Sequence, residues 1–83
     1  MNFWQNERMN TFQKAIHWIG ERYDWTDNEE AERELFKRLN KIDMLILNEA
    51  DIERIKNECR KLCLFVRRNF NKKGVQNGNK QVY

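Results

Sequence analysis

The sequence predicts an all-α protein, an antiparallel helical hairpin against which an N-terminal helix packs. Apolar residues recur every three or four positions in three separate segments, which is the period of one face of an α-helix. The 83 residues include no proline and only three glycines, two of them late in the chain, so an all-β domain with many tight turns is excluded. We expect helices over about 4–23, 27–47 and 49–70, packed as a three-helix bundle.

Each segment aligns its large apolar residues along one stripe, and we expect the three stripes to meet in the core. The stripes are Met9, Phe12, Ile16, Ile19 and Tyr23 in the first segment, Ala31, Leu35, Leu39, Ile42 and Ile46 in the second, and Ile52, Ile55, Cys59, Leu62 and Val66 in the third. No segment sustains the alternation of apolar and polar residues that a half-buried strand shows.

Two of the helix starts carry capping residues. Thr26 stands three residues before Glu29, and Asn48 stands three residues before Asp51. This spacing is that of a capping box, in which the side chain of the first residue accepts a hydrogen bond from a backbone amide in the first turn of the helix. We therefore expect the third helix to begin at Glu49, after a short connection that makes the second and third helices antiparallel neighbours. Residues 1–71 then form one helical domain, and residues 72–83 form a flexible polar and basic tail.

Two short runs are more apolar than a single stripe requires, 42–47 in the second helix and 62–66 in the third. In an antiparallel hairpin these runs lie at opposite ends, so neither can cover the other. A helix that is apolar on several sides needs several partners, and a core of this size is marginal alone. We therefore predict a homo-oligomer. The alternative is a monomer in which the N-terminal helix covers both runs.

Charge is divided along the chain rather than spread evenly. The net charge is +3, yet residues 52–83 hold nine basic and two acidic residues, and residues 29–51 hold four basic and seven acidic ones. Seven-residue spacings predict a basic stripe along the third helix that continues into the tail. Its anion-binding residues are Arg54, Arg60, Lys61, Arg67, Arg68, Lys72 and Lys73. Such a stripe can bind nucleic acid without sequence preference, or it can pair with an acidic second helix and complement the helix dipole.

The first 25 residues hold six of the ten aromatic residues. Trp18 lies beside the N-terminal stripe rather than on it, and Trp4 precedes the stripe. We expect these rings, together with Trp25 and Arg22, to bind a partner, because Trp and Arg side chains anchor protein interfaces and stack on nucleobases. The alternative is that the rings belong to the core.

Residues that could carry catalysis or hold a metal are few. His17 is the only histidine, with Glu21 four residues on, and Cys59 and Cys63 share one helix face. Structural zinc takes four ligands, usually with a short-loop C-x₂-C pair, and the sequence contains no phosphate-binding loop or nucleophile motif. We expect no enzymatic activity, no cofactor and no metal. His17 and Glu21 are expected in contact at the surface, and Cys59 in the apolar seam.

The predicted function is non-enzymatic binding by a small regulator or inhibitor. It would occlude a partner protein's surface through the aromatic N-terminal helix, while the basic third helix steers it toward an acidic surface. The alternatives are nucleic-acid binding through the basic stripe and sequestration of an anionic nucleotide between protomers. The sequence shows no signal-peptide pattern and no spanning apolar run, and its two cysteines are too few for a disulfide scaffold, so we expect a cytoplasmic protein that does not cross a membrane.

Overall fold

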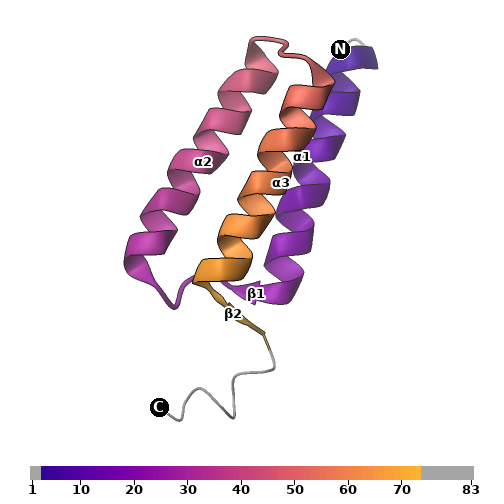
Figure 1. The fold of residues 1–83 in the computed structure, drawn as a ribbon. Coiled ribbons are helices and arrows are strands. Elements are labelled where there is room, and N and C mark those ends of the chain that lie inside the picture. Colours follow the sequence, from indigo (N-terminus) through magenta and orange to yellow (C-terminus); the bar gives the residue numbers. More distant parts are fainter. Residues whose placement is uncertain (1–2, 74–83) are drawn as a thin grey trace.

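The computed structural model describes residues 3–73, with side chains from residue 7 onward, as three helices and one pair of very short strands (Figure 1). In chain order the elements are α1 (Phe3–Arg22), β1 (Tyr23–Asp24), α2 (Glu29–Leu47), α3 (Ile52–Asn69) and β2 (Asn71–Lys72). α2 runs antiparallel to α3, and α1 runs alongside α3 in the same direction (Figure 1). The predicted all-α fold and its three helices are confirmed.

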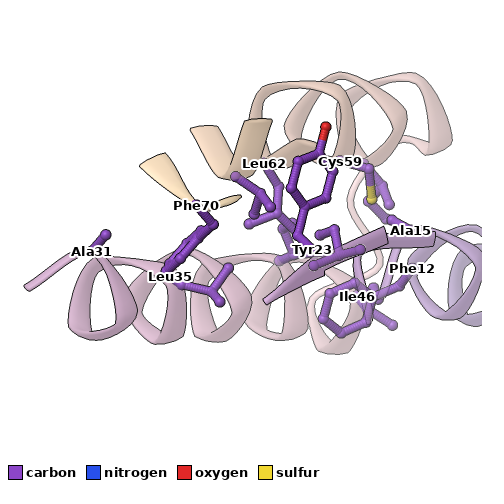
Figure 2. Packing of buried hydrophobic residues seen from close by; sticks show 13 residues of the cluster. Phe12, Ala15, Tyr23, Ala31, Leu35, Ile46, Cys59, Leu62 and Phe70 are labelled. Carbon is purple, nitrogen blue, oxygen red and sulfur yellow. The ribbon is translucent and has the colours of Figure 1, made fainter. Parts of the chain in front are cut away.

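α3 is the central helix of the bundle. It packs along both α1 and α2, whereas α1 and α2 approach each other at few positions. Side chains from all three helices, joined by Tyr23 and Phe70, meet in one buried cluster (Figure 2). Its members are Phe12, Ala15, Ile19, Tyr23, Ala31, Leu35, Ile42, Ile46, Ile55, Cys59, Leu62, Val66 and Phe70. The stripes predicted for the second and third helices supply most of them.

The prediction that Ile16 lies in the core is wrong, since its side chain is 42% exposed. Ile16 points to the side of α1 that faces α2, and these two helices do not close against each other there. Ala15 and Phe70, which lie off the predicted stripes, are buried instead. The first stripe therefore indicated the helix correctly but not all of its buried face.

The connection between α2 and α3 ends α2 in a Schellman motif. The Glu49 amide donates to the Ile46 carbonyl at 3.0 Å and the Ala50 amide donates to the Leu45 carbonyl at 2.9 Å. This motif needs a left-handed residue, and Glu49 supplies it with φ at 57°. The predicted capping box at Asn48 is therefore wrong, and α3 begins at Ile52 rather than Glu49.

The start of α2 also differs from the predicted box. The Asn28 side chain, not that of Thr26, caps the helix by accepting a hydrogen bond from the Ala31 amide at 3.2 Å. The Thr26 hydroxyl instead donates to the Asp24 carboxylate at 2.9 Å. Asn28 also donates from its side-chain amide to the Asn69 carbonyl at 3.3 Å, so one residue caps α2 and joins it to the end of α3.

The segment that follows α3 is tied to the end of α1. β2 pairs antiparallel with β1, with Tyr23 opposite Lys72. The Lys73 amide donates to the Arg22 carbonyl at 2.9 Å, and the Lys73 ammonium donates to the Gly20 carbonyl at 2.6 Å. Lys72 and Lys73 are thus part of the folded unit rather than the start of a flexible tail. The rest of the predicted tail, residues 74–83, lies outside the described residues.

Candidate functional site

A groove between α1 and α3 joins residues that the sequence predicted as two separate sites. We name it the α1–α3 groove, and its volume is about 480 Å³. It is lined by Thr11 and Trp18 of α1 and by Lys56, Cys59, Arg60, Cys63, Leu64 and Arg67 of α3. The spacings within α3 are those of one helix face. α1 runs beside α3 in the same direction (Figure 1), and its Trp18 lines the groove together with that face.

Trp18 forms the aromatic wall of the α1–α3 groove. Its side chain is partly buried against the core, and its ring centroid lies 5.7 Å from that of Tyr23 at an angle of 47°. The Arg22 guanidinium lies over the indole, 5.0 Å from the ring centroid, at a distance typical of a cation–π contact. Two of the predicted partner-binding residues, Trp18 and Arg22, are therefore in contact.

The α3 side of the groove is positively charged. Lys56 pairs with Glu53 at 3.8 Å, and Arg60 donates a hydrogen bond to the neutral Asn57 side chain at 2.8 Å. Among residues 7–73, no carboxylate forms an ion pair with Arg60 or Arg67. Both guanidinium groups are exposed at the rim. The groove can therefore offer two cations to an anionic ligand without first breaking an internal ion pair.

The floor of the α1–α3 groove is apolar, and its two thiols are unreactive. Burial raises the pKa of the Cys59 thiol to about 11, with smaller contributions from the nearby Cys63 and Glu58, and burial also raises the pKa of Cys63. Both thiols are thus protonated at neutral pH, and a protonated thiol is a poor nucleophile and metal ligand. Within the described residues, His, Cys, Asp and Glu side chains form no group of three or more that could hold a metal ion.

The predicted contact between His17 and Glu21 is present, with Nε2 and Oε2 3.0 Å apart. The two side chains are 75% and 58% exposed. They line a shallow hollow on α1 next to Trp18, together with Lys14 and Arg22. Two such exposed side chains lack the burial that tunes a general base, and they lie outside the lining of the α1–α3 groove.

The other predicted site residues lie elsewhere. Lys61 pairs with Glu58 at 3.7 Å, and Glu58 also pairs with Lys41 of α2 at 3.6 Å, so Lys61 belongs to the α2 side of α3. Arg54 and Arg68 share the face of Lys61 at seven-residue spacing. The basic residues of α3 therefore form two sets rather than one stripe. Lys72 and Lys73 lie beyond the helix in and beside β2, and the side chain of Trp4 lies outside the described residues.

Trp25 lines a second groove, which the sequence did not indicate. We name it the α1–α2 groove. It has a volume of about 150 Å³ and is lined by Ile16, Ile19, Gly20, Trp25, Leu35, Phe36 and Leu39. The Trp25 and Phe36 rings meet edge to face, with centroids 5.9 Å apart. Phe36 is 47% exposed although it is large and apolar. The available signal was Phe36 itself, an aromatic residue off the predicted stripe of the second helix.

No protein-family model matches the chain, and no curated protein or solved structure is significantly similar to it. Within residues 3–73, none of the helices combines the length and apolar character that crossing a membrane requires. Only the geometry of the molecule therefore bears on its function.

Proposed function

We propose that this protein is a non-enzymatic binding protein whose α1–α3 groove docks an acidic, amphipathic helical segment of a partner protein. The observation that supports this most directly is the convergence of Trp18 from α1 with Arg60 and Arg67 from α3 on one groove. Aromatic and Arg side chains around an apolar floor are typical of interface anchors. An amphipathic helix fills such a groove with apolar side chains, and its acidic flank pairs with the rim.

The chemistry of the groove favours a protein segment over nucleic acid. A base stacks on an open aromatic face, whereas the Arg22 guanidinium covers one face of Trp18 and Tyr23 lies beside the ring. A nucleic-acid backbone is tracked by a continuous row of cations, and the cations of α3 are divided between two faces. Cys63 and the 47%-exposed Leu64 offer apolar surface that suits an aliphatic side chain.

Binding of this kind regulates by occlusion. A partner helix held in the α1–α3 groove is covered on its apolar face, so it cannot use that face elsewhere. Arg60 and Arg67, which form no ion pair with a carboxylate of residues 7–73, would speed the encounter with an acidic segment, and this steering would weaken at high salt. No catalytic group is needed for this mode of action.

A nuclear magnetic resonance titration tests the proposal. The probe is a synthetic amphipathic helical peptide with leucine on one face and glutamate on the other, added to isotope-labelled protein at low salt. We expect the largest shifts at the Trp18 indole and at the backbone of Arg60, Cys63 and Arg67. A peptide with lysine in place of glutamate is the control and should not bind. Failure of the glutamate peptide to shift these signals would overturn the proposal.

Charge-matched variants locate the binding face. The double variant Arg60→Gln/Arg67→Gln should weaken peptide binding about tenfold, equivalent to about 1.4 kcal/mol. Arg54→Gln/Arg68→Gln removes the same charge from the other face of α3 and should leave the affinity within about twofold, because these residues lie outside the groove. Equal losses in both variants would mean that only net charge matters. Tight, steeply salt-dependent binding of an oligothymidine strand, with no peptide binding, would instead favour the nucleic-acid alternative.

A further inference from the structure

The α1–α2 groove lies beside a partly exposed row of α2 in which two apolar side chains stand between two acidic ones. Glu32, Phe36, Leu39 and Asp43 follow one another at spacings of four, three and four, so they share one face of the helix. Phe36 is 47% exposed, and Leu47, the next residue on the same face, is 64% exposed. We name Glu32, Phe36, Leu39 and Asp43 the acidic row. Leu39 packs partly against the core, whereas Phe36 meets Trp25 edge to face and still exposes about half of its surface.

Gly20 leaves room for a neighbour at the floor of the α1–α2 groove. It lies in the last turns of α1, where glycine is a poorer helix former than alanine. A Cβ atom added at Gly20 would meet nothing within 4 Å outside the helix's own backbone. Packing within the described molecule therefore does not require glycine at this position. A bare helix backbone beside an apolar groove lets a side chain from outside approach closely.

A surface of complementary charge lies on α3. Leu64 is 47% exposed between Arg60 and Arg67, which form no ion pair with any described carboxylate. We name Lys56, Arg60, Leu64 and Arg67 the Leu64 edge. Eleven residues separate Lys56 from Arg67, as eleven separate Glu32 from Asp43, so both pairs span about 16 Å along a helix. The cations of one surface can thus lie opposite the carboxylates of the other, with Leu64 against Phe36.

We infer that the α1–α2 groove and acidic row of one copy bind the Leu64 edge of a second copy. The two surfaces differ, so the contact is heterologous. The assembly then keeps a free acidic row at one end and a free Leu64 edge at the other, and further copies can add there. One helix face buries less area than a stable dimer usually does, so the association is weak and depends on concentration. Because all four residues of the Leu64 edge also line the α1–α3 groove, self-association and partner binding compete. This competition rests on the proposed function, but the self-association does not.

Sedimentation velocity measures the association directly. At low salt, we expect the average mass of the wild-type protein to rise with concentration and to pass that of a dimer, and we expect added salt to lower it. Two single variants should each abolish this growth, Phe36→Gln in the acidic row and Leu64→Gln in the Leu64 edge. Met44→Gln is the matched control, because Met44 is 54% exposed on another face of α2. A wild-type protein that stays monomeric throughout would overturn the inference.

Mixing the two monomeric variants distinguishes a heterologous contact from a symmetric one. Phe36→Gln retains the Leu64 edge and Leu64→Gln retains the acidic row, so an equimolar mixture should form a dimer that grows no further. Absence of that dimer, or wild-type growth that stops at two copies, contradicts the inference. Phe36→Gln also serves as a monomer for the peptide titration. If it still binds the glutamate peptide, the proposed function stands whatever the outcome for self-association.

Gly20→Ala tests the contact between copies with a variant that should not destabilise the fold. Alanine should raise Tm, since the helix gains a better former and the new methyl group meets no neighbour within 4 Å. The same methyl group should weaken self-association severalfold, because it occupies the space that Leu64 of the second copy approaches. A higher Tm with unchanged association would show that the α1–α2 groove is not the contact surface.

Discussion

The two grooves on either side of α1 have opposite characters. The α1–α3 groove has a volume of about 480 Å³, an aromatic wall and a basic rim, whereas the α1–α2 groove has about 150 Å³, an apolar lining and a neighbouring row with Glu32 and Asp43. The difference arises from the helix that faces α1 in each case. The charge that is divided along the sequence between residues 29–51 and 52–83 therefore becomes two distinct faces of the folded molecule.

The two grooves also differ in how the fold supports them. α1 packs along α3 but approaches α2 at few positions, so the α1–α3 groove lies beside two closely packed helices and the α1–α2 groove lies between two helices that meet at few positions. Polar contacts at the two ends of α1 hold it in place beside α3. Arg8 of α1 donates to the Ala50 carbonyl at 2.6 Å at one end, and Lys73 donates to the Gly20 carbonyl at 2.6 Å at the other.

The largest effect is expected in the core that all three helices share. Ile55 of α3 is fully buried, and Ile55→Ala should lower the free energy of unfolding by about 2–5 kcal/mol, through lost burial and a cavity. Leu64→Ala removes comparable side-chain volume from an exposed site and should change it by about 0.5 kcal/mol or less. Urea unfolding followed by circular dichroism measures both, and Ile55→Val provides a milder variant in case the alanine variant does not fold. Equal effects at the two sites would contradict the central position of α3.

A smaller effect should distinguish the observed cap of α2 from the expected one. Asn28→Ala removes the hydrogen bonds to the Ala31 amide and to the Asn69 carbonyl. It should lower the free energy of unfolding by about 1 kcal/mol. Thr26→Ala should cost about 0.5 kcal/mol or less, since Thr26 caps no helix. Trp25 lies in the same connection, so loosening Asn28 should shift the resonances of the α1–α2 groove more than those of the α1–α3 groove. A larger loss of unfolding free energy for Thr26→Ala than for Asn28→Ala would show that Thr26 caps α2, as the capping box predicts.

A substitution in the connection between α2 and α3 should be able to stabilise the protein without altering either groove. Glu49 is a non-glycine residue with φ at 57°, a conformation that costs about 1 kcal/mol or more for a residue with a Cβ atom. Glu49→Gly should therefore be more stable than Glu49→Ala by about 1 kcal/mol, measured by thermal unfolding. Both variants lose the carboxylate, so charge cancels in the comparison. Equal Tm values would show that the left-handed turn carries no strain.

The last expected effect appears only at alkaline pH, and its source lies in the α1–α3 groove. The pKa of Cys59 is raised from 9.0 to about 11, mainly by burial, so folding favours the protonated thiol. This contribution is fully present below pH 9 and is lost as the pH rises through about 11. The Tm of the wild-type protein under reducing conditions should thus fall more steeply over that range than the Tm of Cys59→Ala. Parallel curves for the two proteins would exclude Cys59 as the source.

The sequence predicted the helices well because their apolar spacing is local information. The stripe from Ala31 to Ile46 and the stripe from Ile52 to Val66 bury most of the residues that the period indicates, whereas Leu39 and Ile52 are only partly buried. Boundaries were less predictable, since several residues can cap a helix. Asn28 is the cap rather than Thr26 because it also bonds to the Asn69 carbonyl, 41 residues away. A local capping pattern in the sequence gives no information about a hydrogen-bond partner this far along the chain.

The candidate site was predicted only as separate parts. Trp18, Arg60 and Arg67 stood out by residue type and spacing, but nothing in the sequence placed the tryptophan beside the two arginines. The single predicted basic stripe also included Lys61, although Lys61 pairs with Glu58 on the α2 side of α3. Small differences in angle around a helix decide which neighbour a side chain meets, and the neighbour is known only once the helices are packed.

The sequence alone therefore determined the three helices, most of their buried stripes and the division of charge between the second and third helix, because each depends on neighbours a few positions apart. Only the tertiary structure decided that α3 lies at the centre, that α1 leaves a groove on each side, and that Lys72 and Lys73 are tied to α1. These features depend on contacts between residues up to about 50 positions apart, whose geometry follows from the packing of whole helices.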